Sequence, residues 1–176
     1  MNSNLLTGIA ALVTFPGIIL HEWSHKLICA RLAVPVYKTC YFRLGNPAGY
    51  IVHAEVKSFG KVFSIAMAPF LICSGLAATT FGLAFILPSS TTLRLALYWL
   101  GISLAMHSLP STQDVNNLYC HARQSCNRNI IALLALPAVW LIKLLRFHDS
   151  MWAGLLHAVI MLIATGLLLR GVKLLL

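Results

Sequence analysis

The chain has 176 residues, of which 59% are hydrophobic and only 10% are charged, and its formal net charge is +9. A soluble domain is nearer a quarter charged, so this composition excludes an ordinary soluble protein and predicts an all-α polytopic membrane protein. The basic residues fall in short stretches between apolar segments. This placement favours membrane topology and contact with the lipid bilayer, and we expect no nucleic-acid partner.

The first apolar segment runs from about Leu5 to Ala33 and predicts a membrane-spanning helix. No basic n-region or cleavage site precedes it, so we expect the segment to be retained. Pro16 and Gly17 lie inside it and predict a kink. The pair is either the ordinary Pro and Gly of a membrane helix, or it makes room for a substrate strand.

Residues 21–25 of this segment read His-Glu-Trp-Ser-His. Positions four apart share one face of a helix, so His21 and His25 can bind one metal ion. Glu22 directly follows the first histidine, where a carboxylate can reach water at the metal. The alternative is a helix with two ordinary histidines, but ionisable groups inside an apolar segment are costly and usually mark a function. The pattern predicts a Zn²⁺ hydrolase with Glu22 as its general base.

A polar interruption follows the first segment. Two runs rich in aromatic and β-branched residues, Tyr37–Arg43 and Tyr50–Val56, flank the turn signal Leu44–Gly49. They predict a β-hairpin. It is either a plain surface hairpin or an edge that accepts an extended substrate peptide by β-augmentation. The residues of that candidate edge strand are Tyr50, Ile51 and Val52.

Four further apolar segments bring the expected number of transmembrane helices to about five. Residues 1–176 are expected to form a single transmembrane metalloprotease-like domain, with a core in 1–120 and extra helices in 128–176. Ser111 or Thr112 is predicted to cap a helix that runs through Asp114. The five cysteines are odd in number and none forms Cys-x-x-Cys, which favours reduced thiols. The four segments are Val62–Leu87, Leu93–Leu109, Ile130–Leu145 and Trp152–Leu169.

Lysine and arginine predict the orientation of a multi-pass protein. Ten of the thirteen fall on the side that holds the hairpin and the C-terminus, and three on the other. The N-terminus should therefore face outward and the hairpin the cytosol; Lys143 and Arg146 are the discordant pair. Leu5 to His21 is about 24 Å of straight helix in an apolar core of about 30 Å. The active site is therefore expected inside the membrane, near the cytosolic side.

A catalytic zinc needs a third protein ligand. Asp114 is one of four acidic residues in the chain, and the segment that begins near Leu93 returns it to about the depth of the two histidines. Asp114 is the predicted ligand and His107 the alternative, with Glu55 and His53 as more distant options. Asp114 can also be read as a charge that favours a helix N-terminus.

In this order of features the chain resembles the site-2 protease family of intramembrane zinc metalloproteases. The resemblance rests on H-E-W-S-H in the first span, a hairpin after it and an aspartate after a later proline, and it covers about the first 120 residues. It implies that His21, His25 and Asp114 bind zinc and that Glu22 activates water. It also implies a membrane-protein substrate, cut in its spanning segment within or near the bilayer.

The chain also departs from that family. The family usually has the motif Asn-x-x-Pro, whereas this chain has His107 at the position of the asparagine. The aspartate is usually followed by glycine in the family, but here Asp114 is followed by Val115. No PDZ domain is recognised, so the resemblance is to a divergent compact member. An alternative is a non-proteolytic membrane protein that keeps a structural or regulatory zinc site. A metal transporter is disfavoured because its polar residues would line a path through the bilayer, whereas these form one cluster.

Overall fold

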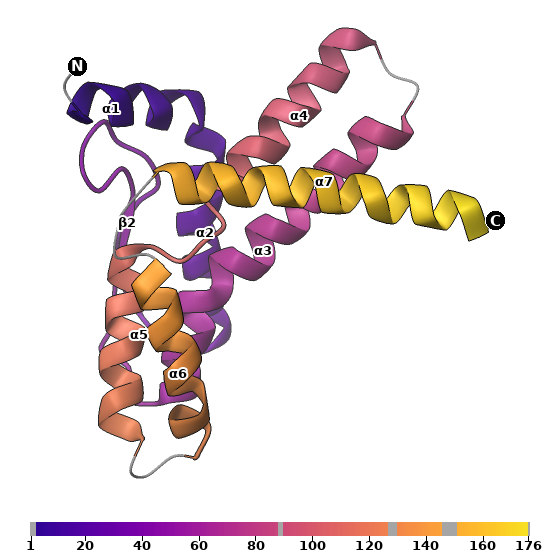
Figure 1. Ribbon diagram of the computed structural model, residues 1–176. Coiled ribbons are helices and arrows are strands. Elements are labelled where there is room, and N and C mark those ends of the chain that lie inside the picture. The colour runs from indigo at the N-terminus through magenta and orange to yellow at the C-terminus, as the bar shows by residue number, and fades with distance from the viewer. Residues whose placement is uncertain (1–2, 88–89, 127–129, 146–150, 176) are drawn as a thin grey trace.

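The computed structural model describes residues 3–87, 90–126, 130–145 and 151–175. Within them the chain is mostly helical, with seven helices and one two-stranded antiparallel sheet (Figure 1). In chain order the elements are α1 (Ser3–Val13), α2 (Phe15–Arg31), β1 (Val36–Cys40), β2 (Tyr50–His53), α3 (Phe59–Ile86), α4 (Thr91–Met106), α5 (Thr112–Ser125), α6 (Ile130–Leu145) and α7 (Met151–Leu175).

The first apolar segment differs from the single helix that was expected. It divides at Thr14, whose backbone (φ −111°, ψ 25°) is not helical, and α1 is turned away from the axis of α2 (Figure 1). Pro16 lies in the first turn of α2. The N–H groups of a first turn have no acceptor within the helix, so a proline there costs no helical hydrogen bond. The depth of the predicted metal site therefore cannot be measured along one straight helix from Leu5.

Gly17 explains how α2 approaches α4. The Ser103 hydroxyl accepts a hydrogen bond from the Gly17 N–H (2.9 Å) and donates one to the Thr14 carbonyl (3.0 Å). It thus supplies the cap that the Thr14 side chain does not make. A Cβ on Gly17 would collide with the backbone carbonyl of Ser103. The space beside Gly17 is filled by α4 rather than left open for a substrate strand.

The end of α2 is a Schellman motif. The Val34 N–H donates to the Cys29 carbonyl (2.8 Å) and the Ala33 N–H to the Ala30 carbonyl (3.2 Å). Ala33 has the left-handed φ of 54° that this motif requires and that glycine usually provides. The motif ends the helix and turns the chain into β1.

The β-hairpin is confirmed, with shorter strands than the sequence pattern suggests. Lys38 is opposite Val52 and Cys40 opposite Tyr50, with an irregularity between Val36 and Lys38. Both strands contact α2. The hairpin is therefore held against the helix that carries His21 and His25.

Helix α3 is central to the packing, since it contacts α2, α4, α5 and α7. Two apolar clusters form around it. One joins α2, α3, α5 and α6 through residues that include Cys29, Ile65 and Leu118, and the other joins α3, α4 and α7 around Phe81 and Leu104. All five cysteines are free thiols, as the sequence predicts.

Two helices, α3 and α7, are long and apolar enough to cross a membrane. Their 28 and 25 residues correspond to about 42 and 37 Å, more than an apolar core of about 30 Å. Helices α4 and α6 are apolar but shorter. Leu71, Leu134 and Leu168 are at least 68% exposed, so broad apolar surface faces outward. The remaining three of the five expected spans stay predictions.

Candidate metal centre

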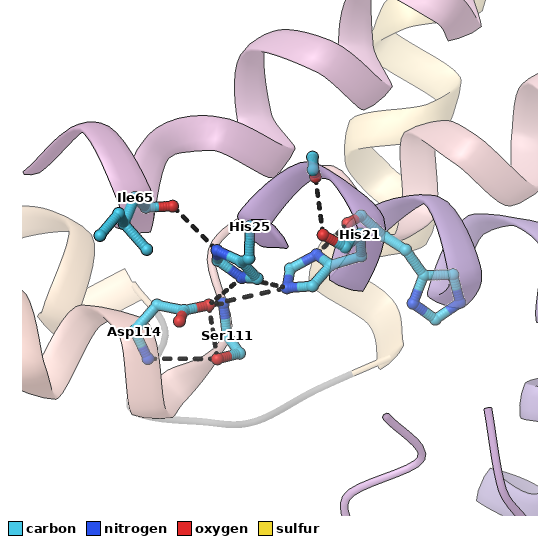
Figure 2. Close-up of polar contacts among 7 residues, drawn as sticks. His21, His25, Ile65, Ser111 and Asp114 are labelled. Carbon is cyan, nitrogen blue, oxygen red and sulfur yellow. Dashed lines mark hydrogen bonds and ion pairs between the residues drawn. The ribbon is translucent and has the colours of Figure 1, made fainter. Parts of the chain in front are cut away.

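The two histidines of the motif face each other on one side of α2, as their spacing predicts. Their ring centroids are 4.8 Å apart in an edge-to-face arrangement, and their Nε2 atoms are 3.2 Å apart (Figure 2). Both are buried, with exposed fractions of 8% for His21 and 6% for His25.

Asp114, in the first turn of α5, completes the cluster. Its Oδ2 lies 3.6 Å from His21 Nε2 and 3.4 Å from His25 Nε2 (Figure 2). The three atoms form a nearly equilateral triangle. Zn–N and Zn–O bonds of about 2.0–2.2 Å in a tetrahedral site place ligand atoms about 3.3–3.5 Å apart, so the triangle has the size of one face of such a site. The structure therefore places together three side chains that can hold one metal ion.

Backbone carbonyls fix the orientation of both imidazoles. His21 Nδ1 donates to the His107 carbonyl (2.7 Å), and His25 Nδ1 donates to the Ile65 carbonyl (2.8 Å). A carbonyl only accepts, so each Nδ1 carries a proton, and in the neutral imidazole this leaves the lone pair on Nε2. This is the arrangement that metal-binding histidines normally have.

Ser111 holds the carboxylate of Asp114. Asp114 Oδ2 accepts hydrogen bonds from the Ser111 N–H (2.8 Å) and the Ser111 hydroxyl (2.7 Å), and that hydroxyl accepts from the Asp114 N–H (3.1 Å). The pair forms a capping box at the start of α5, which confirms Ser111 as the cap. Asp114 thus caps its own helix with the same oxygen that faces the histidines.

Glu22 is buried beside the cluster, with 9% of its surface exposed. Gly49, the last residue before β2, lies against its side chain: a Cβ on Gly49 would be 2.7 Å from Glu22 Cγ and 3.0 Å from Oε1. The hairpin loop therefore covers the carboxylate that the sequence assigns as the general base.

The alternative ligands lie outside the triangle. His107 Nε2 is 2.8 Å from the Thr14 hydroxyl, and His107 contributes to the centre through its carbonyl, as described for His21. His53 Nδ1 donates to the Ala54 carbonyl (2.8 Å). His53 and Glu55 line a cavity that shares Asp114 with the cluster, but neither of them is one of the three potential ligands.

Two residues that shape the site were not assigned this role from the sequence. Ser111 was expected only as a helix cap, although Ser-x-x-Asp at 111–114 is a capping-box pattern that ties the serine to the aspartate. Gly49 was read only as part of a turn. Its approach to Glu22 depends on how the hairpin packs on α2, which the local pattern does not encode.

No protein-family model matches the chain, and neither the curated proteins nor the solved structures contain a significant match.

Proposed function

We propose that the protein is a zinc-dependent intramembrane peptidase of the site-2 protease type. The observation that carries this proposal is the triangle of His21, His25 and Asp114, whose imidazoles are locked by carbonyls, with a buried carboxylate next to it on the same helix. A site that only stabilised the fold would not need Glu22 in that position.

The donor set supports zinc over the other common divalent metals. Two imidazole nitrogens and one carboxylate oxygen are typical of catalytic zinc, whereas calcium and magnesium prefer oxygen ligands alone. Three protein ligands leave a coordination position open, as hydrolytic zinc sites require. When bound, zinc polarises a substrate carbonyl and lowers the pKa of water.

Glu22 is the residue to which we assign proton transfer. It takes a proton from the attacking water, whose oxygen bonds to the carbonyl carbon of the scissile peptide, and it passes that proton to the leaving nitrogen as the C–N bond breaks. Burial and contact with Gly49 limit the positions that its carboxylate can occupy. His21, His25 and Asp114 would hold the metal, and Ser111 holds Asp114 in place.

The apolar exterior supports a membrane setting. Helices α3 and α7 can span a bilayer, and large apolar side chains cover the outer faces of several helices. We propose a multi-pass protein whose site opens near the cytosolic side, following the excess of basic residues on the hairpin side. The substrate is then a membrane-spanning segment, unwound into an extended strand that can pair with the Tyr50–Val52 edge.

The test compares wild-type protein with Glu22→Gln in membrane vesicles, using quantitative mapping of newly formed protein termini as the readout. The wild type should create termini within or beside membrane-spanning segments, and a chelator should abolish them until zinc is restored. Glu22→Gln should retain zinc and lower the rate by about a hundredfold or more, because it removes the base but keeps size and polarity. Trp23→Phe, at an exposed position on the same helix, is the matched control.

Cleavage that persists in Glu22→Gln would make the assigned mechanism wrong. Zinc-loaded wild type that produces no new termini would instead favour the alternative of a non-proteolytic zinc protein in the membrane.

A further inference from the structure

A cavity of about 210 Å³ adjoins the metal centre. Its walls come from the last residue of β2 and the segment that follows it, the first turns of α3, and one face of α5. Asp114 belongs to both the cavity and the metal cluster. Whatever occupies the cavity therefore lies next to the candidate metal centre.

The floor of the cavity is apolar and its rim is polar. The floor consists of the buried side chains Val56, Val62, Ile65 and Ala66. The rim carries the exposed carboxylate of Glu55, the amide of Asn117, and the half-buried imidazoles of His53 and His121. The cavity therefore suits a side chain with a long apolar stem and a polar end.

The rim groups favour a positively charged end. Glu55 and Asp114 are two of only four acidic residues in a chain of net charge +9. Among the described residues Glu55 forms no ion pair, so its charge is available to an incoming group. His53 donates through Nδ1 to the Ala54 carbonyl, which leaves its Nε2 as an acceptor. Glu55 also lines a second cavity together with Lys57 and Lys61. Neither lysine forms an ion pair with Glu55 in the described part of the chain, and Lys61 donates instead to the Leu32 carbonyl (3.0 Å).

We propose that this cavity is a substrate subsite for a lysine or arginine side chain close to the scissile bond, with Glu55 as the residue that determines specificity. The inference rests on the proposed peptidase function and names a feature of its substrates. Basic residues are enriched at the cytosolic ends of membrane-spanning segments, so such a subsite would select the cytosolic boundary of the substrate. The apolar floor takes the stem, and the acceptors of the rim bind the charged end.

The experiment maps new termini in vesicles that contain wild type, Glu55→Gln, Glu55→Lys or Glu22→Gln, and aligns the cut sites. For wild type, lysine or arginine should be enriched at one fixed position relative to the cut. Glu55→Gln should weaken that enrichment, and Glu55→Lys should lower cleavage of basic sites by about tenfold and favour aspartate or glutamate there. Zinc content should be the same in all four proteins, which controls for folding.

Two negative results can be told apart. If cleavage depends on Glu22 but shows no basic position, or if Glu55→Lys leaves the preference unchanged, the subsite is wrong and the peptidase stands. If no cut depends on Glu22, the proposed function itself fails, and the subsite fails with it.

Discussion

Gly49 of the hairpin loop lies directly against Glu22 of α2. A methyl group at position 49 would be 2.7 Å from Glu22 Cγ and 3.1 Å from the Tyr41 carbonyl, so it could not be added without a shift of the loop or of the glutamate. The φ of Gly49 is not positive, so lack of space rather than backbone conformation explains the glycine. The hairpin therefore helps to position the proposed catalytic base.

Gly49→Ala should lower peptidase activity by about ten- to a hundredfold, because displacement of a catalytic group by about 1 Å has an effect of that size. Zinc content should not change, since the ligands come from α2 and α5. Gly45→Ala is the control within the same loop: its nearest neighbours are side-chain atoms of Arg43 at 3.7 and 4.0 Å, an ordinary contact. Equal activity in the two variants would contradict a positioning role for Gly49.

The metal cluster illustrates what could be predicted from the sequence. His21 and His25 are four residues apart on one helix, so their common face follows from helix geometry alone. Asp114 is predicted from the rarity of acidic residues in the chain and from its expected depth. The structure places it beside the histidines although α4 ends at Met106, well before it.

The first segment illustrates what could not be predicted in this way. Pro16 and Gly17 predict a kink in this segment, but they do not indicate that the helix breaks completely at Thr14, where the break is stabilised by Ser103 from far along the chain. The cap at Gly17 and the contact of Gly49 with Glu22 also depend on tertiary packing. Local patterns predict most of the helices and the common face of His21 and His25, whereas interactions between distant segments set the position of the break and the surroundings of Glu22.

Zinc content tests the cluster directly. Purified wild type should contain about one zinc per chain, and His21→Ala or His25→Ala should lose most of it, because two ligands hold zinc far less tightly than three. His157→Ala is the control: its Nε2, on α7, lies 3.4 Å from the Ser74 hydroxyl, and His157 is not one of the three potential ligands. Elemental analysis that shows full zinc in both ligand variants would refute the metal site.

Ser111→Ala should affect both the helix and the metal. It removes the hydroxyl that donates to Asp114 Oδ2 and accepts from the Asp114 N–H. The lost cap should lower the free energy of unfolding by about 1 kcal/mol, and the freed carboxylate should weaken zinc affinity by about ten- to a hundredfold. Ser90→Ala removes the cap of α4, where Ser90 accepts from the Leu93 N–H (3.3 Å). In competition with a zinc chelator, only the Ser111 variant should lose affinity.

Topology can be tested independently of catalysis. An epitope inserted between Lys57 and Lys61, and a reporter fused after Leu176, should both be found on the cytosolic side, because most basic residues lie on that side of the predicted spans. Protease protection in sealed vesicles provides the measurement. An epitope accessible only from the opposite side would reverse the proposed orientation, and the site would then open to the other face of the membrane.

The final prediction distinguishes Asp114 from His107 as the third ligand. Asp114→Asn removes the negative charge of a proposed ligand oxygen. Loss of a hydrogen-bond partner of a ligand lowers metal affinity by up to about a hundredfold, so loss of this charge should lower zinc affinity by more than that, and activity should fall with it. His107 acts through its backbone carbonyl, which accepts from His21 Nδ1 and is kept in any substitution, while its imidazole faces Thr14. His107→Ala should therefore retain zinc, with at most a modest loss of activity from the missing Thr14 contact. The opposite result, with zinc lost in His107→Ala and kept in Asp114→Asn, would assign the third ligand to His107 and would require that ring to turn away from Thr14.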